Sequence, residues 1–335
     1  MKIPFTQTKE YLSWHEANNE KTFYKEFFHF ENSDIAEERD YQIDDEKEFE
    51  NVKVLDAIVA AFVLNLKIGK VLYVPYGPVI FDNSEKIKTE IKNYLYDLAK
   101  KENCVFVRFE DKNNFFKNAK YFIWPAKKAF AKEGIFQPRV EWWLDLQNSE
   151  ENIYDNFHKD HRYSIRRAQK ENIEVEIFTN NLEEKFEDFW QLLKETSLRD
   201  GFHLYEENYY RAIFKNSENK FLVFTKDAKK YLSIALIVIS DKIANLVFAG
   251  SISENREKGF NHLMQWEAIK KSKNINCEFY NFGGIHENGY GKESLQGVTN
   301  FKKRFGGFVK FHGDFVDLPI KKAKYFLYIL KKYFS

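Results

Sequence analysis

Residues 283–307 carry the side chains of this sequence that could do chemistry. The segment opens with two glycines at 283 and 284, continues through a loop with further glycines, and ends in the run NFKKRFGG at residues 300–307. Glycine lets a ligand come close to the backbone. The three consecutive cations of this run suit an anionic ligand or an oxyanion that develops during a reaction. A purely structural loop could have the same composition, so the segment alone leaves both interpretations open.

Two stretches of the chain repeat one order of elements and must position this segment. Each contains a strand, a glycine, a helix and a second strand, and Gly77 precedes Cys104 by the same number of residues as Gly250 precedes Cys277. The predicted strands are 71–79, 103–109, 245–251 and 276–282, and the predicted helices are 84–101 and 260–272. Matched order and spacing predict a duplicated α/β unit.

The remaining patterns complete an outline of the chain. Apolar and alternating runs predict strands at 56–67 and 140–146 and a hairpin of 221–224 with 232–239, whereas helical spacing predicts helices at 152–171 and 182–199. The second half therefore reads helix, helix, hairpin, strand, glycine loop, helix, strand. This order is typical of the Gcn5-related acetyltransferase (GNAT) fold, as an analogy at the level of the fold.

Composition limits the classes of partner and site. The 335 residues include 52 basic and 51 acidic side chains, so a nucleic-acid partner would need a local basic patch. Cys104 and Cys277 show no pairing pattern, which fits a reducing cytoplasm. The eight histidines are scattered, and we expect no metal site.

The C-terminal segment is basic and aromatic and contains no acidic residue over residues 321–334. It could lie on an anionic membrane surface, or it could form a helix that docks on its own domain. We therefore expect a cytoplasmic protein with possible peripheral contact with the inner face of the membrane.

Several short segments together resemble the Fem-type (FemABX) aminoacyltransferases of peptidoglycan bridge synthesis. They occur in the order of that family from about residue 55 to 315 and are YGPV at 76–79, QPR at 137–139 before LDL at 144–146, IRRA at 165–168 before IEV at 173–175, FAGS at 248–251, QWEA at 265–268, FGGI at 282–285 and FKKRFGG at 301–307. No sustained heptad pattern is present, so the chain resembles the short form without a coiled-coil arm.

The resemblance implies an α/β (α+β) fold with two tandem GNAT-like domains, each a mixed sheet flanked by helices. This agrees with the duplication seen independently in the sequence. We predict a first domain over residues 1–147, a second over 148–316 and a basic aromatic C-terminal helix over 317–335.

The resemblance also implies a reaction. The amine of a diamino residue in the stem peptide attacks the ester carbonyl of an aminoacyl-tRNA, which is the co-substrate, and no cofactor takes part. The acceptor is a peptidoglycan precursor, either lipid II or UDP-MurNAc-pentapeptide. The enzyme then aligns the reactants and stabilises an oxyanion. Lys302 and Phe301 occupy the catalytic positions of the family, although a lysine on a solvated helix face is the alternative for Lys302.

Other site residues follow from the same resemblance. Tyr209 matches a substrate-contacting tyrosine, Tyr205 stands where some members have a diphosphate-binding arginine, and Lys21 is the nearest candidate for an assisting lysine. Gly77, Phe248 and Ser251 lie in matching segments and are expected at the substrate. Tyr205 replaces that arginine, and Phe248 stands where the family often has a tyrosine. These differences from the family disfavour a nucleotide-linked acceptor and leave a lipid-linked acceptor open.

Basic side chains supply the candidates for tRNA contact. Arg162, Arg166 and Arg167 share one predicted helix, and Lys303 and Arg304 follow Lys302. Phosphate binding requires a patch of this kind, although charged runs are often only solvated helix faces.

Two other functions stay open. The segment REKGFN at residues 256–261 approaches the pyrophosphate-binding pattern of acyl-CoA N-acyltransferases at a helix start. A catalytically silent module that binds the precursor or tRNA is the third possibility. An acyl-CoA enzyme would act without tRNA, and a silent module would bind without turnover.

Overall fold

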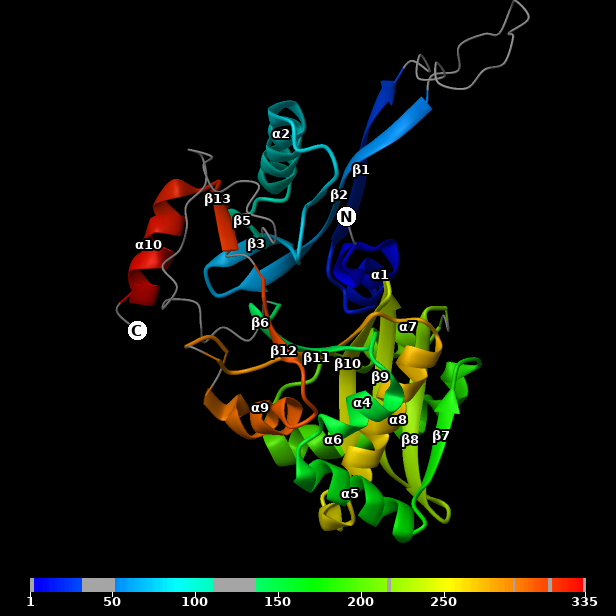
Figure 1. The fold of residues 1–335 in the computed structure, drawn as a ribbon. Helices are drawn as coiled ribbons and strands as arrows, with labels where there is room; N and C mark the ends of the chain where they lie inside the picture. The colour runs from blue at the N-terminus through cyan, green and yellow to red at the C-terminus, as the bar shows by residue number, and fades with distance from the viewer. Residues whose placement is uncertain are drawn as a thin grey trace, which may run out of the picture.

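Two β-sheets form the framework of the chain (Figure 1). The computed structural model describes residues 3–31, 52–110, 137–215, 218–287, 289–291, 293–312 and 315–333. Within these residues the first sheet has the strand order β1-β2-β3-β5-β13, and β4 pairs with β2. Its strands are β1 (Thr22–Glu31), β2 (Val52–Leu66), β3 (Gly69–Val74), β4 (Val79–Ile80), β5 (Phe106–Glu110) and β13 (Phe315–Pro319).

Helices cover this sheet on both faces. They are α1 (Lys9–Ala17), α2 (Glu85–Lys101) and α10 (Lys322–Tyr333). Helix α2 begins where the Ser84 hydroxyl accepts the amide N–H of Ile87 at 3.3 Å. Its residues Ile87, Ile91, Leu95 and Ala99 recur every four positions and are buried against the sheet. Helix α10 covers the opposite face at Phe106.

The second sheet has the order β12-β6-β11-β10-β9-β8-β7 in the described residues. Its strands are β6 (Val140–Asp145), β7 (Glu174–Phe178), β8 (Lys220–Asp227), β9 (Lys230–Ser240), β10 (Ile243–Ser251), β11 (Phe279–Gly284) and β12 (Phe308–Phe311). The helices of this half are α4 (Glu150–Asp155), α5 (Lys159–Lys170), α6 (Phe186–Asp200), α7 (Glu207–Phe214), α8 (Phe260–Asn274) and α9 (Gln296–Lys303).

The predicted repeat of strand, helix and strand is confirmed. Strands β3 and β5 are parallel and are joined through α2, and strands β10 and β11 are parallel and are joined through α8. Both sheets are mixed, because their other strand pairs are antiparallel. The predicted fold class, two tandem GNAT-like units of mixed sheet and helix, is confirmed.

The predicted ranges 1–147, 148–316 and 317–335 do not follow the two sheets. Strand β6 lies before residue 147 but pairs with β11 and β12 in the second sheet. Strand β13 crosses residue 316 and pairs with β5 in the first sheet. The predicted ranges differ from the sheets because β6 and β13 pair with strands that are distant in the sequence. The apolar pattern of a strand does not specify which strand it pairs with. The predicted C-terminal helix is present as α10.

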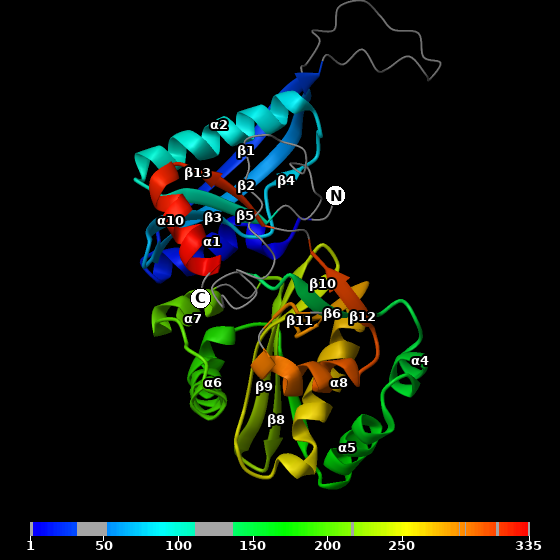
Figure 2. The same ribbon diagram turned by 90° about the vertical axis from the view of Figure 1, so that its left-hand side faces the viewer.

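One predicted helix is divided in the structure. Instead of a single helix over 152–171, α4 ends at Asp155 and α5 begins at Lys159. Phe157 is buried between them, and the His158 imidazole accepts the amide N–H of Asp160 at 3.3 Å. The break turns the chain so that α5 can pack on α8 (Figure 2).

A single large core joins the two sheets. It includes Phe62 and Tyr73 of the first sheet, Tyr11 and Trp14 of α1, and most of the buried side chains of the second sheet. Helix α1 lies against α7 in this region. Among the described residues, no helix has both the length and the apolar character needed to cross a membrane.

Candidate functional site

Lys302 lies where two parallel strands separate. Strands β10 and β11 pair over only three residues, from Ile243 to Asn245 and from Phe279 to Asn281, and a bulge in β10 follows after Leu246. The Nζ atom of Lys302, on α9, donates to the carbonyl oxygen of Gly284 at 2.6 Å. It also lies 3.9 Å from the position that a Cβ of Gly283 would occupy. The glycines at the end of β11 therefore give this ammonium its space.

The surroundings of Lys302 disfavour its charge. Burial lowers the pKa of its ammonium from 10.5 to about 8, and the Glu141 carboxylate acts against that shift. Desolvation is the larger effect because it penalises the charged form directly. Near neutral pH the group is therefore a cation that readily gives up its proton.

Glu141 is the centre of a buried polar network. Its side chain belongs to β6 and is 5% exposed. The Tyr76 hydroxyl donates to Oε1 at 3.0 Å, and Trp143 Nε1 and Asn281 Nδ2 donate to Oε2 at 3.0 and 3.1 Å. His312 Nε2 lies 2.5 Å from the same oxygen. Four partners from different segments thus fix one carboxylate between the two sheets.

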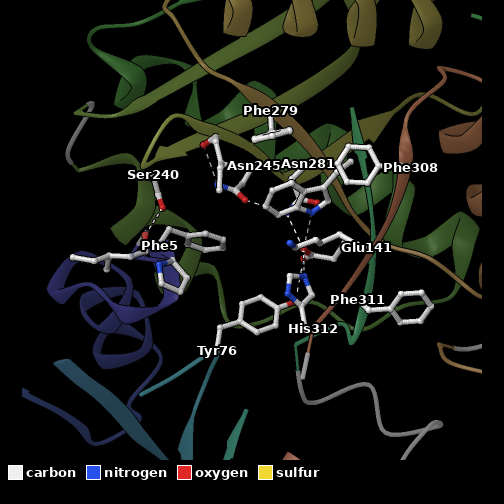
Figure 3. A pocket seen from close by; sticks show the side chains of 15 residues that line it. Phe5, Tyr76, Glu141, Ser240, Asn245, Phe279, Asn281, Phe308, Phe311 and His312 are labelled. Atoms are coloured by element: carbon white, nitrogen blue, oxygen red, sulfur yellow. Dashed lines mark hydrogen bonds and ion pairs between the residues drawn. The ribbon is translucent and has the colours of Figure 1, made fainter. Parts of the chain in front are cut away.

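A cavity of about 350 Å³ opens beside this network (Figure 3). Its polar side chains include Glu141, Asn245, Asn281 and His312. Its walls are largely aromatic and come from the N-terminal segment, the connection between β3 and β4, and the second sheet; they are formed by Phe5, Tyr76, Trp143, Phe279, Phe308 and Phe311. Aromatic walls around a few polar groups are typical of a small-molecule or peptide site.

A second carboxylate extends the network into the first sheet. Glu110, 2% exposed at the end of β5, accepts the Tyr73 hydroxyl at 2.7 Å and the amide N–H of Tyr76 at 2.8 Å. The Tyr73 hydroxyl accepts the amide N–H of Gln137 at 2.9 Å. Burial and Glu110 raise the pKa of Tyr73 well above its usual value, so this phenol stays a hydrogen-bond donor.

Phe301 packs against α5 and α8. Its ring lies 5.2 Å from that of His161 and 5.1 Å from that of His262. Burial lowers the pKa of His161 to about 3 and that of His262 to about 4, so both imidazoles are neutral at pH 7. Phe301 is therefore held in an uncharged aromatic environment next to Lys302.

Tyr205 and Tyr209 form a separate aromatic cluster with α1. The two rings stack at 4.3 Å, and the Tyr209 ring lies 5.3 Å from that of His15. Tyr209 is buried and Tyr205 is 42% exposed. Phe248 reaches this cluster through Tyr210, at a ring distance of 5.1 Å. The structure thus brings together three of the predicted substrate-binding residues, with His15 added.

Lys21 lies elsewhere. Its Nζ forms an ion pair with Glu102, at the end of α2, over 2.7 Å. The side chain that faces Tyr205 and Tyr209 from the N-terminal segment is His15, which also pairs with Glu20. The structure therefore places His15 at this tyrosine pair and leaves Lys21, the predicted candidate, in an ion pair with Glu102.

Gly77 and Ser251 are held by contacts within the protein. A Cβ on Gly77 would lie 2.4 Å from the Cδ of Gln7, whose amide bonds the backbone of Ala60. The Ser251 amide N–H donates to the Thr196 hydroxyl at 2.7 Å, and the Ser251 carbonyl accepts from Arg199 at 2.8 Å. These contacts give both residues a role in packing.

The predicted tRNA-binding cations lie on α5 and α9. Arg162 donates to the carbonyls of Asp155 and Phe157 and so closes the end of α4. Arg167 lies 3.9 Å from Glu171, Lys303 pairs with Glu287, and Arg304 reaches Asp160 at 3.3 Å. Arg166 is exposed. The Arg304–Asp160 pair brings the C-terminal end of α9 to the N-terminal end of α5.

Sequence reasoning missed Glu141, Glu110 and His312. A glutamate in the apolar run VEWWLD was the available signal, because buried carboxylates are rare unless they are paired. Nothing in the local sequence marked Glu110 or His312. Among the described residues no group of three or more histidine, cysteine or acidic side chains is arranged to hold a metal ion.

The fold defines a class of proteins with two tandem GNAT-like units, and in this chain Lys302 lies at the opening of the parallel strand pair of the second unit. The chain matches the FemAB family over residues 126–232 and 217–332, more than half of its length, and belongs to that family.

Solved structures agree in fold. A crystal structure of FemX matches with a TM-score of 0.73 and 15% identity over 97% of this chain and 94% of FemX. The structure of L-PGS from Bacillus licheniformis matches with a TM-score of 0.53 and 16% identity over 83% of this chain and 85% of that one. The C-terminal domain of a putative lysylphosphatidylglycerol synthetase from Agrobacterium fabrum matches with a TM-score of 0.51 and 10% identity over 82% and 85%. A comparison with curated proteins finds no match.

Proposed function

We propose that this protein is a cytoplasmic aminoacyltransferase that uses aminoacyl-tRNA to add an amino acid to the stem-peptide side-chain amine of a peptidoglycan precursor. The observation that carries the proposal is the position of Lys302. In a chain of the FemAB family, an ammonium with a pKa of about 8 stands at the opening between β10 and β11, and the Glu141 carboxylate, whose charge acts on that pKa, lines the cavity.

The reaction needs no covalent intermediate on the enzyme. The acceptor nitrogen forms a bond with the ester carbonyl carbon, and the bond from that carbon to the ribose oxygen breaks. The proton lost by the amine ends on the released ribose hydroxyl. Negative charge develops on the carbonyl oxygen between these events, and the Lys302 ammonium stabilises it.

Glu141 prepares the acceptor for this attack. An acceptor amine enters as an ammonium ion, and a buried carboxylate in an aromatic cavity attracts such a cation. Because Tyr76, Trp143 and Asn281 hold the carboxylate in place, little reorganisation is needed when the ammonium arrives. Glu141 takes one proton from the bound ammonium, which becomes the neutral amine nucleophile, and later releases that proton to water; Lys302 acts on the electrophile.

In the proposed reaction, the aminoacyl-tRNA approaches from the side of α5 and α9. Phe301 lies there next to Lys302, and the cations of these helices lie near the expected path of the tRNA acceptor end. Arg166 and Arg304 are exposed members of the group, whereas Arg162 serves the turn between α4 and α5.

The acyl-CoA alternative receives less support from the structure. Gly259 precedes α8 with φ of +82°, and a Cβ at this position would lie 2.2 Å from the carbonyl oxygen of Ser164. Packing of α8 on α5 therefore accounts for this glycine, with no need for a pyrophosphate.

The test is transfer of labelled amino acids from a charged tRNA pool to the muramyl-pentapeptide acceptor, with the Lys302→Ala and Glu141→Gln variants. We expect label in the precursor that depends on tRNA and falls strongly in both variants. The matched control is Lys229→Ala, an exposed lysine of a distant turn. Transfer from acyl-CoA without tRNA would contradict the proposal, and binding of both substrates without turnover would indicate a silent module.

A further inference from the structure

Helix α10 is fixed to the first sheet by one of its sides. The rings of Tyr325 and Tyr328 lie 5.2 and 5.4 Å from the ring of Phe106. The Tyr325 hydroxyl also donates to Asp317 at 3.0 Å. These contacts set the rotation of the helix about its axis, so the direction of its other side chains follows from the helical repeat.

The outer side of α10 is an apolar stripe. Ala323, Phe326, Leu327 and Leu330 are spaced as one face of a helix and are all exposed. The exposed fractions are 63% for Phe326, 65% for Leu327 and 50% for Leu330. Single exposed apolar side chains are ordinary, but several on one face mark an interaction surface. Figures 1 and 2 show α10 on the outside of the molecule.

Lysines border this stripe on both sides. At 100° per residue, Lys322 falls on one side of the stripe and Lys324 and Lys331 on the other. All three are exposed, and none has an ion-pair partner among the described residues. The sequence contains no acidic residue after Asp317. The surface that α10 presents is therefore apolar in the middle and cationic at its edges.

We propose that this outer face of α10 docks on an anionic lipid bilayer. Apolar side chains flanked by lysines match a surface whose headgroups are negative and whose interior is apolar. A nucleic-acid partner would use the lysines but would leave Phe326, Leu327 and Leu330 in water. The bilayer satisfies both features of the face.

Docking also selects the acceptor. A protein held at the membrane meets a lipid-linked precursor by diffusion in two dimensions, whereas a nucleotide-linked precursor gains nothing. This part rests on the proposed transfer reaction; the docking itself does not.

Sedimentation with vesicles tests the docking. The full-length protein is mixed with vesicles of phosphatidylglycerol and phosphatidylcholine, or of phosphatidylcholine alone, at several salt concentrations. We expect binding to the anionic vesicles that weakens as salt rises. The variant with Lys324→Gln and Lys331→Gln should bind on the order of 25-fold more weakly, since each lysine near such a surface contributes roughly a fivefold factor. The variant with Phe326→Ser and Leu330→Ser should bind on the order of tenfold more weakly.

Matched controls lie on distant elements. Leu198→Ser removes an apolar side chain that is 86% exposed on α6, and Lys229→Gln with Lys230→Gln removes two exposed cations. Both should bind vesicles like the wild type. Absence of binding to anionic vesicles, equal binding of the α10 variants, or a loss of tRNA affinity in the lysine variant with unchanged vesicle binding would each overturn the proposal.

A second experiment tests which acceptor is used and distinguishes failure of the docking proposal from failure of the proposed function. Transfer is measured to a lipid-linked acceptor in anionic vesicles and to a nucleotide-linked acceptor in solution. We expect Phe326→Ser with Leu330→Ser to lose at least fivefold with the lipid-linked acceptor only. Equal loss with both acceptors would overturn the selection of a lipid-linked acceptor. No transfer by the wild type to either acceptor would reject the proposed function, while sedimentation would still decide the docking.

Discussion

At the residue scale, the desolvated ammonium of Lys302 lowers the stability of the fold, and the same charge serves the proposed reaction. Its ammonium is desolvated at the end of β11, and its one hydrogen bond among the described residues goes to the Gly284 carbonyl. A fall in pKa from 10.5 to about 8 corresponds to a cost on the order of 3 kcal/mol at pH 7. An uncompensated cost at a strand opening is typical of a functional position.

Removal of the Lys302 charge should therefore not weaken the fold. We expect Lys302→Met to raise the free energy of unfolding at pH 7 by about 1–2 kcal/mol, because the loss of one hydrogen bond offsets part of the relief. Urea denaturation measures this, with Lys229→Met as the control that should be neutral. A clear loss of stability would mean that the ammonium serves the fold.

The pH dependence of stability follows from the same shift. The pKa of Lys302 is lower in the folded chain than in the unfolded chain, so the unfolded chain binds more protons between about pH 8 and 10.5. The contribution of this residue to stability should rise over that interval. The difference in unfolding free energy between the Lys302→Met variant and the wild type should shrink over the same interval.

The pH dependence of transfer has the opposite sign. The reaction uses the protonated form of Lys302, which is lost as pH rises through about 8. We expect kcat to fall above pH 8 in the wild type and, at pH 7, to fall by a factor of roughly 10² to 10³ in Lys302→Ala. In Lys302→Arg the remaining activity should persist to higher pH, since arginine keeps its proton. If kcat falls above pH 8 in Lys302→Arg as it does in the wild type, the titrating group is not Lys302.

At the element scale, β13 is attached to the first sheet by a buried ion pair. Arg108 of β5 donates to both carboxylate oxygens of Asp317 at 2.7 Å, and both side chains are fully buried. Tyr325 of α10 donates to the same carboxylate. One aspartate thus links β5, β13 and α10.

Loss of that carboxylate charge should be strongly destabilising. We expect Asp317→Asn to lower the free energy of unfolding by about 3–5 kcal/mol, because Arg108 would stay buried without its counter-charge. The paired variant Arg108→Met with Asp317→Leu should recover most of the loss. Chemical denaturation of the three proteins measures both effects; a double variant no better than Asp317→Asn would show that the charges themselves are needed.

The same scale shows what the sequence could predict. The helix of residues 84–101 and the two units of strand, helix and strand were predicted, because their periodicity and spacing are local. The break at Phe157 and the return of β13 to the first sheet were not, since each depends on packing against distant residues. In the site, a sequence motif located Lys302. The role of Glu141 could not be predicted, because the side chains that bind its carboxylate come from four separate segments.

At the scale of the whole molecule, the two sheets share one core. Helix α1 packs on α7, Glu10 of α1 pairs with the buried Lys220 of β8, and Ser240 bonds the backbone of Ile3 at 2.8 Å. The Tyr76 hydroxyl crosses between the sheets to Pro138 at 2.6 Å and to Glu141. The first sheet has further buried clusters under α2 and α10, but the joint core is the one that holds side chains of both sheets.

The two halves should therefore unfold together. We expect a single urea transition with the same midpoint by tryptophan fluorescence and by far-ultraviolet circular dichroism. Glu10→Ala should move both curves equally, by about 2 kcal/mol or more, because it leaves the buried Lys220 ammonium without its partner between the two halves. Two separate midpoints would contradict a shared core.

The position of β13 has a consequence for the newly made chain. Arg108 leaves the ribosome 209 residues before Asp317. At roughly 5–20 residues per second, the first sheet waits on the order of 10–40 s before β13 and the Asp317 carboxylate are available to pair with β5 and Arg108. By then the strands of the second sheet have already emerged. The half of the protein that is translated first is thus the half that is completed last, and a ribosome that stops before residue 317 releases a chain whose open edge invites pairing with other strands.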